Sequence, residues 1–344
     1  METMSSNRPR EINVGCAGNA AFALPIAVML TSVVCNAKTN RDIHIYIIES
    51  DMTDSLRQKI EQSVLQNKKS FHQVTFHWTK LDQFPTYDLP ESKKHHLITP
   101  DAYSRLLLPN VLPEEAEQLI YLDADVVVIA DLALLSDSAD KNCTMCAAPS
   151  VILPYVSSTG HEGIPLVFNY VELGIPASNR YFNSGVLVIN LKPWRKNQIS
   201  SRVIDYVQRH RKQVLLYDQG ALNAILFDQW SPLDNRWNQT YTIMLPEWWS
   251  TELYSREDWR RIKNDPFIVH YTGPDKPWLP GYKRPRLSFF TPYLKKTLFK
   301  NDVKIFSIES IIGYRLYFSL WSTKRNIHRL LLQWAARFRG KKTA

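Results

Sequence analysis

An apolar run from Leu119 to Ile129 is interrupted at its centre by two carboxylates, Asp123 and Asp125. The flanking residues are β-branched or large and apolar without alternation, which indicates a strand covered on both faces in a parallel sheet. Unpaired carboxylates inside such a strand cost free energy. They are tolerated at the carboxyl end of the strand, where α/β sheets bind their ligands. We therefore expect a ligand site at this end of the strand.

The spacing of the two carboxylates is compatible with a single metal ion. Residues i and i+2 of an extended chain point the same way, so Asp123 and Asp125 can both reach one ion. A divalent cation would neutralise the two charges. The alternative is that one Asp caps the following turn and the other pairs with an arginine, and these residues alone leave both interpretations open.

Strand-like and helix-like segments alternate before this run, which predicts an α/β fold with a parallel, doubly wound sheet. The predicted strands cover 11–17, 43–48 and 74–78, and the predicted helices cover 20–34 and 53–66. The apolar stretch 20–34 also fits a secretory signal, but the strand before it favours a Rossmann-type first helix. No stretch reaches the roughly 18 apolar residues that a membrane span requires, so we expect a soluble or peripheral protein.

The length of 344 residues, 44% of them hydrophobic, is enough for one large α/β domain and an appendage. We expect a disordered N-terminus over residues 1–10, the main domain over 11–280 and an extension over 281–344. Four cysteines are few for this length and suit reduced, buried thiols in a reducing compartment. Cys143 and Cys146 have the spacing of a redox or zinc half-site, but no second Cys or His pair completes a tetrahedral set.

The net charge of +9 is concentrated at the C-terminus. Residues 281–344 contain fifteen Lys or Arg and two acids, a charge of +13, which leaves −4 for residues 1–280. Positive charge of this density beside aromatic residues indicates an anionic partner, either a membrane or a nucleic acid. Amphipathic patterns at 308–320 and 327–338 favour an interfacial anchor on an anionic bilayer over nucleic acid. A solvated helical extension packed on the domain is the remaining alternative.

Two further segments place polar residues at the ends of predicted elements. Asn183 and Ser184 enter a predicted strand and can hydrogen-bond to a polyhydroxylated ligand, while Gly185 permits close approach to the backbone. Asp218 and Gln219 stand at the head of a predicted helix. An N-cap would account for Asp218 but not for Gln219.

Arg105 and the segment around His270 add cationic and metal-binding groups. Arg105 lies in a segment that we expect to lead into the central strand, and its guanidinium suits a phosphate, although an ordinary surface ion pair is an equal alternative. His270 ends a short predicted strand and is followed by Gly273 and Lys276. A neutral imidazole can join two carboxylates on Mn²⁺, and a lysine can neutralise a phosphate.

Together these motifs resemble the family 8 glycosyltransferases, which include bacterial lipopolysaccharide galactosyl- and glucosyltransferases and the glycogenins. The resemblance covers most of residues 11–280 and follows the family's motif order. The matching pieces are Phe22-Ala23-Leu24-Pro25, Tyr103-Ser104-Arg105-Leu106, Tyr121-Leu122-Asp123-Ala124-Asp125, the segment 181–194, Asp218-Gln219 with Leu222-Asn223, and the segment 270–278.

The resemblance implies a Rossmann-like GT-A fold with a mixed, mainly parallel sheet that binds a nucleotide sugar. It implies that Asp123, Asp125 and His270 bind Mn²⁺, with Mg²⁺ as the alternative, and that the ion holds the diphosphate of a donor that is usually UDP-linked. It also implies that Asp218 and Gln219 are catalytic residues beside the sugar. The implied donor-binding residues are Asn19, Arg105, Asp123, Ala124, Asn183, Ser184, Gly273 and Lys276.

The implied reaction is transfer of a hexose, with retention at the anomeric carbon, from UDP-glucose or UDP-galactose to a glycan or lipid-linked acceptor such as lipopolysaccharide core. We expect front-face attack by the acceptor hydroxyl. The enzyme would work in the cytoplasm, peripherally on the membrane through residues 281–344. The segment 18–21 lacks the acidic residues with which the family usually contacts the nucleotide, so the donor sugar stays open.

Two alternatives belong to other classes of protein. An apolar strand followed by Asp-Ala-Asp also fits the nucleophile strand of haloacid-dehalogenase-type phosphatases. Membership of that class would not account for the motif from His270 to Trp278. The second alternative is a non-catalytic relative that binds sugar nucleotides without turnover.

Overall fold

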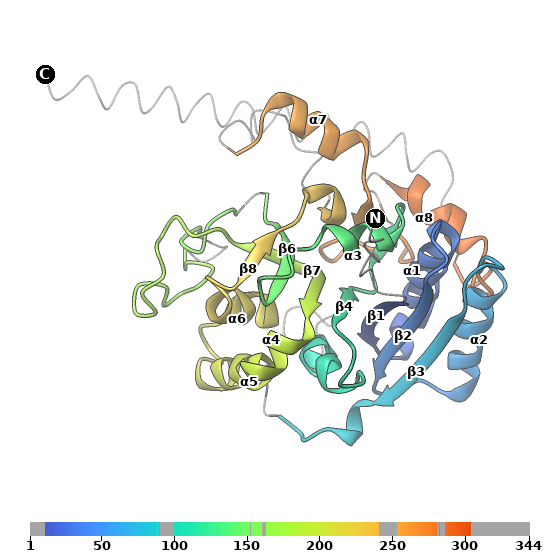
Figure 1. Cartoon of the computed structure of the whole chain (residues 1–344), viewed down its shortest axis with the longest axis horizontal. Helices are drawn as coiled ribbons and strands as arrows, with labels where there is room; N and C mark the ends of the chain where they lie inside the picture. The colour runs from blue at the N-terminus through green and yellow to red at the C-terminus, as the bar shows by residue number, and fades with distance from the viewer. Residues whose placement is uncertain are drawn as a thin grey trace, which may run out of the picture.

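The computed structural model describes residues 11–87, 89, 100–151, 153–159, 163–240, 253–280, 282 and 286–303. The central element is a seven-stranded sheet with the order β3-β2-β1-β4-β7-β6-β8 (Figure 1). Its strands are β1 (Glu11–Gly18), β2 (Asp42–Glu49), β3 (Val74–Lys80), β4 (Gln118–Leu122), β6 (Met145–Pro149), β7 (Phe182–Asn190) and β8 (Trp230–Pro232). A second sheet has the order β5-β10-β9 and consists of β5 (Val126–Val128), β9 (Gln239–Thr240) and β10 (Ile268–His270).

Strand β7 is antiparallel to the other strands of the large sheet. The pairs β1–β2, β2–β3, β1–β4 and β6–β8 are parallel, whereas β7 pairs antiparallel with both β4 and β6. The expected mixed, mainly parallel sheet is therefore confirmed. The purely parallel sheet predicted from the strand–helix alternation is wrong, because an apolar run reads the same in either strand direction.

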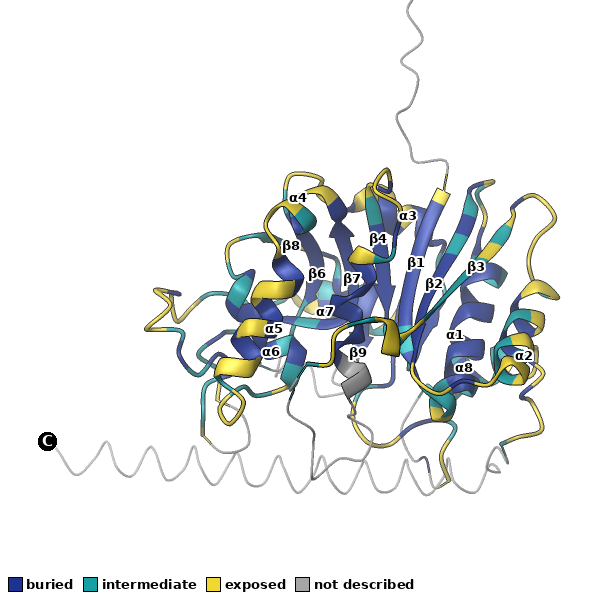
Figure 2. Ribbon diagram, turned by 90° about the horizontal axis from the view of Figure 1, so that it is seen from below, coloured by how far each residue is buried: buried dark blue, intermediate teal, exposed yellow. Residues whose placement is uncertain are grey.

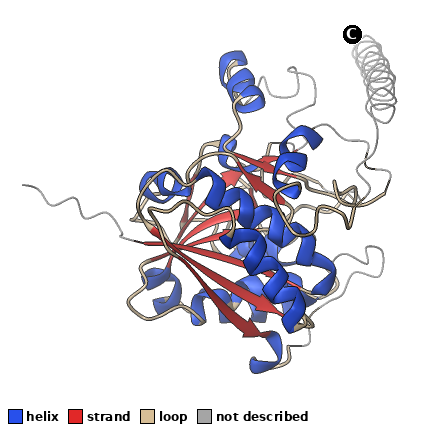
Figure 3. Ribbon diagram, turned by 90° about the vertical axis from the view of Figure 1, so that its right-hand side faces the viewer, coloured by secondary structure: helices blue, strands red, loops and turns tan. Residues whose placement is uncertain are grey.

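Helices cover both faces of this sheet (Figure 3). One core packs β1 and β2 against α1 and α8, and the other packs the opposite faces of the same sheet against α5, α6 and a 3-10 segment, η3 (Pro100–Leu106). Side chains alternate between the two cores along β2, with Ile45 in the first and Tyr46 in the second. The helices are α1 (Ala23–Asn36), α2 (Asp54–Leu65), α3 (Leu132–Ser138), α4 (Leu191–Lys196), α5 (Ile199–Arg209), α6 (Tyr217–Ile225), α7 (Arg256–Asn264) and α8 (Leu287–Leu294).

The five elements predicted before the aspartate pair are all present. Local chemistry explains their ends: Thr53 caps α2 by accepting a hydrogen bond from the Leu56 amide at 3.3 Å. The inner strands of the large sheet are largely buried, the edge strands β3 and β8 are partly exposed, and most fully exposed residues lie on the outer sides of the helices and in loops (Figure 2). Glu11 to Gly18 therefore form a sheet strand, and the apolar segment after them is the packed helix that was favoured over a signal peptide.

The central apolar run is two strands rather than one. Strand β4 ends at Leu122, the chain turns at Asp123 to Asp125, and β5 continues in the second sheet. The Val126 amide lies 3.3 Å from the Asp123 carbonyl oxygen across this turn. The prediction of one continuous extended strand is wrong, because the chain leaves one sheet for the other where the carboxylates stand.

The predicted domain limits fall partly outside the described residues. Residues 1–10 and 304–344, which include the amphipathic segments 308–320 and 327–338, are not described. Within the predicted extension, α8 packs on α1, and Phe290, Leu294 and Phe299 join the first core. Among the helices that the structure describes, none is long and apolar enough to cross a bilayer.

Candidate metal and donor site

Three potential metal ligands converge at the carboxyl end of β4. Asp123 and Asp125 come from the turn between β4 and β5, and His270 is the last residue of β10, which pairs antiparallel with β5 so that His270 faces Val126. One ligand atom from each lies within 4.8 Å of the others, and no other such group of three occurs among the described residues. His270 Nε2 is 3.1 Å from Asp125 Oδ1 and 3.7 Å from Asp123 Oδ2. We call these three residues the metal cluster.

His270 is oriented by Asn238, which the sequence analysis did not predict. His270 Nδ1 is 2.8 Å from Asn238 Oδ1, and both residues are buried. When Nδ1–H donates this bond, Nε2 is left as a neutral acceptor facing the carboxylates, which is the arrangement typical of a metal-binding imidazole. Asn238 Nδ2 in turn donates to Asn183 Oδ1 at 2.7 Å. Two carboxylates and an imidazole oriented in this way suit Mn²⁺ or Mg²⁺.

Gly185 provides the space for this histidine. A Cβ added at Gly185 would lie 2.2 Å from His270 Cε1 and 2.8 Å from Asp123 Oδ2. The Gly185 carbonyl also accepts a hydrogen bond from the Asp123 amide at 2.8 Å. The groups that approach the Gly185 backbone closely, as predicted, are therefore His270 and Asp123. A side chain larger than hydrogen at this position would displace them.

Lys276 contacts the metal cluster directly. Its Nζ forms an ion pair with Asp125 Oδ2 and donates to the Tyr271 carbonyl at 2.9 Å. Burial alone would raise the pKa of Asp125, but His270, when its imidazole is protonated, and the Lys276 ammonium hold this pKa below its usual value. Asp125 is therefore held in its charged form, the form that binds a cation.

Arg105 connects the metal cluster to the predicted sugar residues. Its guanidinium lies 2.9 Å from Asp123 Oδ1 and 3.0 Å from Asp218 Oδ2, and it donates to the Ser184 carbonyl at 2.8 Å. It also lies over the Tyr121 ring, 4.6 Å from the ring centroid. Arg105 is buried, so the alternative of an ordinary surface ion pair is wrong. This residue fixes the distance between two carboxylates that would otherwise repel each other.

Asp218 and Gln219 occupy the first turn of α6. Gln219 Oε1 accepts from Asn183 Nδ2 at 3.0 Å and from the Ser184 amide at 3.1 Å. Burial raises the pKa of Asp218 to about 6, although Arg105 opposes this shift. The N-cap of α6 is Leu216, so the interpretation of Asp218 as an N-cap is wrong.

The backbone before Asp218 is strained. Leu216 and Tyr217 have φ angles of 56° and 53°, in the left-handed region that side chains with a Cβ rarely adopt. Two consecutive residues of this kind cost free energy, which the surrounding packing must offset. The strained turn places Asp218 and Gln219 next to Asn183 and Ser184 at the start of β7.

The remaining predicted donor residues lie at the same edge of the sheet but in separate turns. Asn19 follows β1, the neighbour of β4, and its Oδ1 accepts from the Ala21 amide at 3.1 Å. Ala124 stands between the two metal-cluster aspartates. Gly273, with a φ of 87°, forms the turn between His270 and Lys276.

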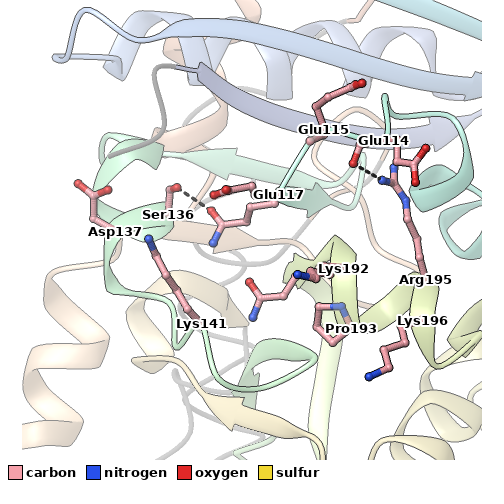
Figure 4. Close-up of a pocket in the computed structure, with 13 residues that line it drawn as sticks. Glu114, Glu115, Glu117, Ser136, Asp137, Lys141, Lys192, Pro193, Arg195 and Lys196 are labelled. Carbon is pink, nitrogen blue, oxygen red and sulfur yellow. Dashed lines mark hydrogen bonds between the residues drawn. The ribbon is translucent and has the colours of Figure 1, made fainter. Parts of the chain in front are cut away.

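A separate cleft of about 810 Å³ lies at the opposite edge of the sheet (Figure 4). Gln118 at the start of β4 and Asn190 at the end of β7 line it, together with glutamates and lysines on its rim. None of the predicted site residues lines this cleft.

Comparison with known proteins gives consistent matches. The model described as Glycosyl transferase family 8 matches residues 13–280. General stress protein A of Bacillus subtilis (strain 168) is 29% identical over 287 residues, which are 83% of this chain and 93% of that protein. Lipopolysaccharide 1,2-glucosyltransferase of Escherichia coli (strain K12) is 25% identical over 296 residues, which are 85% of this chain and 80% of that protein.

Solved structures show the same fold. The galactosyltransferase LgtC in complex with donor and acceptor sugar analogs superimposes with a TM-score of 0.66 at 20% identity, covering 83% of this chain and 96% of that chain. The bifunctional glycosyltransferase WbbM, in its apo structure, gives a TM-score of 0.66 at 17% identity, covering 85% of this chain and 51% of that one. The expected GT-A-like α/β glycosyltransferase fold is therefore confirmed.

Proposed function

This chain belongs to glycosyl transferase family 8, and we propose that it is a metal-dependent, retaining transferase that moves a hexose from UDP-glucose or UDP-galactose to a glycan or lipid-linked acceptor. The observation that carries the proposal is the metal cluster, flanked by Lys276 and Arg105 at the carboxyl edge of the sheet. Membership of the family makes the phosphatase alternative wrong.

The metal cluster accounts for donor binding. Asp123, Asp125 and His270 would hold Mn²⁺, or Mg²⁺, which when bound supplies positive charge to the departing diphosphate. Lys276 contacts Asp125, and we assign it to neutralising a phosphate oxygen of the donor. We assign Arg105, Asn19, Ala124 and Gly273 to donor binding as well.

Asp218, Gln219, Asn183 and Ser184 form the proposed sugar pocket. Breaking the bond between sugar and phosphate gives the sugar oxocarbenium character, which a buried carboxylate and amide oxygens can stabilise. The hydrogen bonds from Asn183 and Ser184 fix the Gln219 side chain beside Asp218. We propose front-face attack by the acceptor hydroxyl, with the departing phosphate taking its proton.

Replacing Asp218 by Asn is expected to lower turnover by about 100-fold, because the neutral amide cannot stabilise positive charge on the sugar. The affinity for UDP with Mn²⁺ should stay within a few-fold of the original, since the three metal-cluster residues are unchanged and Arg105 keeps its ion pair with Asp123. Steady-state kinetics and UDP calorimetry check this. Asp205→Asn on the exposed side of α5, where Asp205 pairs with Arg209, is the matched control. Undiminished turnover in Asp218→Asn would show that the Asp218 carboxylate is not needed for catalysis.

The proposed acceptor and the proposed location at the membrane rest on the similar proteins and on the positive charge of residues 304–344. A relative named lipopolysaccharide 1,2-glucosyltransferase supports a lipopolysaccharide-type acceptor. Residues 304–344 carry nine Lys or Arg and one acid, which suits the surface of an anionic bilayer. We propose that the protein works in the cytoplasm at the membrane surface through the segment 281–344.

Removing residues 304–344 is expected to abolish sedimentation with anionic vesicles while leaving UDP binding intact. The cut follows Val303 because Phe290, Leu294 and Phe299 belong to the core. Each lost cation near the surface removes about 1 kcal/mol of attraction. Removing residues 1–10, which carry a net charge of +1, is the matched control. Equal sedimentation of the full chain and the truncated chain would refute the anchor, and preference for duplex DNA over vesicles would favour a nucleic-acid partner.

The donor is identified by screening UDP-, GDP- and ADP-sugars for hydrolysis with Mn²⁺ or Mg²⁺. We expect one UDP-hexose to be hydrolysed and the activity to disappear when the metal is chelated. Binding of UDP with Mn²⁺ but no turnover with any donor or acceptor would instead identify a non-catalytic relative.

A further inference from the structure

A pair of thiols lies away from the donor site. Cys143 stands in the bend before β6, and Cys146 is the second residue of that strand. Cys146 pairs with Val188 on β7, four residues beyond Ser184, which corresponds to roughly 13 Å along the strand. The two Sγ atoms are 3.4 Å apart, and both cysteines are free. We call these two residues the dithiol.

Hydrogen bonds hold the two sulfurs together. The Asp140 carbonyl oxygen lies 3.3 Å from the Sγ of Cys143 and 3.6 Å from that of Cys146, so it can accept from either thiol. Asn190 Nδ2, at the end of β7, donates to the carbonyls of Asp140 and Cys143 at 2.9 and 2.6 Å. The bend is thus fixed to the sheet, and closing the remaining gap to a bond of about 2.05 Å requires only a small movement of the sulfurs.

The two cysteines differ in exposure and in acidity. Cys143 is partly exposed and Cys146 is buried. A hydrogen bond from Cys146 and contacts with Ser231 lower the pKa of Cys143 to about 6, against the opposing effect of burial. The pKa of Cys146 is raised, chiefly because it shares its proton with Cys143. A partly exposed, acidic thiol beside a buried partner is the arrangement of a nucleophilic and a resolving cysteine.

We propose that Cys143 and Cys146 form a thiol–disulfide exchange site that takes low-molecular-weight disulfides. The Cys143 thiolate attacks one sulfur of a disulfide RSSR, forming a mixed disulfide and releasing RS⁻, which takes up a proton as RSH. Cys146 then loses its proton and attacks the Cys143 sulfur, closing the intramolecular disulfide and releasing the second RS⁻. The dithiol loses two electrons and two protons, and RSSR is reduced to two RSH.

One observation disfavours a metal at this position, and a second indicates access for a small disulfide. The metal cluster is the one group of three His, Cys, Asp or Glu ligands found in the described residues, so no third such protein ligand joins the dithiol there. Lys141, in the same bend, lines the cleft at this edge of the sheet, so the bend borders open space.

The test uses the full-length reduced protein and glutathione disulfide, followed by mass spectrometry of the intact chain and of its peptides. The wild type should form a bond between Cys143 and Cys146, with the loss of two hydrogens. Cys146→Ser should instead accumulate a glutathione adduct on Cys143, and Cys143→Ser should react slowly. Cys35→Ser, which changes a thiol outside the pair, should behave as the wild type.

The pH dependence gives a second readout that needs no variant. Because the thiolate is the reactive form, labelling of Cys143 by iodoacetamide should rise through about pH 6 and then level off. At pH 6 it should be roughly tenfold faster than labelling of free cysteine, whose pKa is about 8.5. Glutathione found chiefly on Cys35, or labelling of Cys143 that is no faster than that of free cysteine, would overturn the proposal.

Discussion

Replacing Asp125 by Asn is expected to abolish sugar transfer, lowering turnover by roughly 1000-fold or more. The change removes a carboxylate that faces both His270 and Lys276, and with it about 4 kcal/mol of charge stabilisation in the transition state. Donor-dependent release of UDP is the measurement. Mn²⁺ affinity, measured by calorimetry on the same preparation, should fall in parallel.

Stability must be separated from catalysis in this variant. Asn leaves the Lys276 ammonium buried without its carboxylate partner, so the melting temperature should also fall. Asp125→Glu retains the negative charge but moves the carboxylate. It therefore tests whether the loss of turnover comes from the missing charge or from the changed position of the carboxylate. Metal-dependent turnover that survives in a folded Asp125→Asn protein would show that the metal cluster is not the catalytic centre.

Replacing Gly185 by Ala is expected to lower Mn²⁺ affinity by roughly 10- to 100-fold, with a matching loss of activity. The added Cβ would lie 2.2 Å from His270 Cε1, so the imidazole must move away from the carboxylates. The free energy of unfolding should fall by about 1–3 kcal/mol, as for other overpacked sites. Denaturant unfolding and metal calorimetry measure the two effects separately.

A glycine on β1, which β4 separates from β7 in the sheet, provides the control for this substitution. A Cβ at Gly15 would meet the side chains of Leu119 and Leu108 at 2.9 to 3.0 Å, and neither is a proposed metal ligand. Gly15→Ala should therefore reduce stability without changing metal affinity. Combining Gly185→Ala with His270→Ala should restore part of the lost stability but none of the metal binding. Additive losses of stability would mean that the clash with His270 is not the cause.

The arrangement of elements was predictable because its signals are local. Runs of apolar residues, helix periods and the Thr53 cap fix where β1, α1, β2, α2 and β3 lie. The reversal of β7 was not predictable in this way, since its direction depends on pairing with β4 and β6 rather than on its own residues. The break after Leu122 was missed for a related reason. Valines 126 to 128 look like a continuation of β4, and only their pairing with β10 places them in another sheet.

The candidate metal ligands were predictable, whereas the residue that orients His270 was not. Asp123 and Asp125 stand one residue apart inside an apolar run, and His270 ends another, so the sequence indicates a possible metal site. Asn238 carries no such signal, because nothing in the sequence distinguishes the last residue of the short 3-10 segment η5 (Asn235–Asn238) from other asparagines. Its importance arises from its contacts with His270 and Asn183, residues 32 and 55 positions away. Lys276 was expected at a phosphate, and the structure adds its contact with Asp125.

We propose that one divalent ion joins the aspartate turn to the end of β10 and thereby holds a nucleoside diphosphate. Titrating the full chain with Mn²⁺ in the presence of UDP, by calorimetry and by electron paramagnetic resonance, tests it most directly. We expect one bound ion per chain in the wild type, and loss of that ion together with UDP affinity in His270→Ala. Unchanged Mn²⁺ and UDP binding in a folded His270→Ala protein would contradict it.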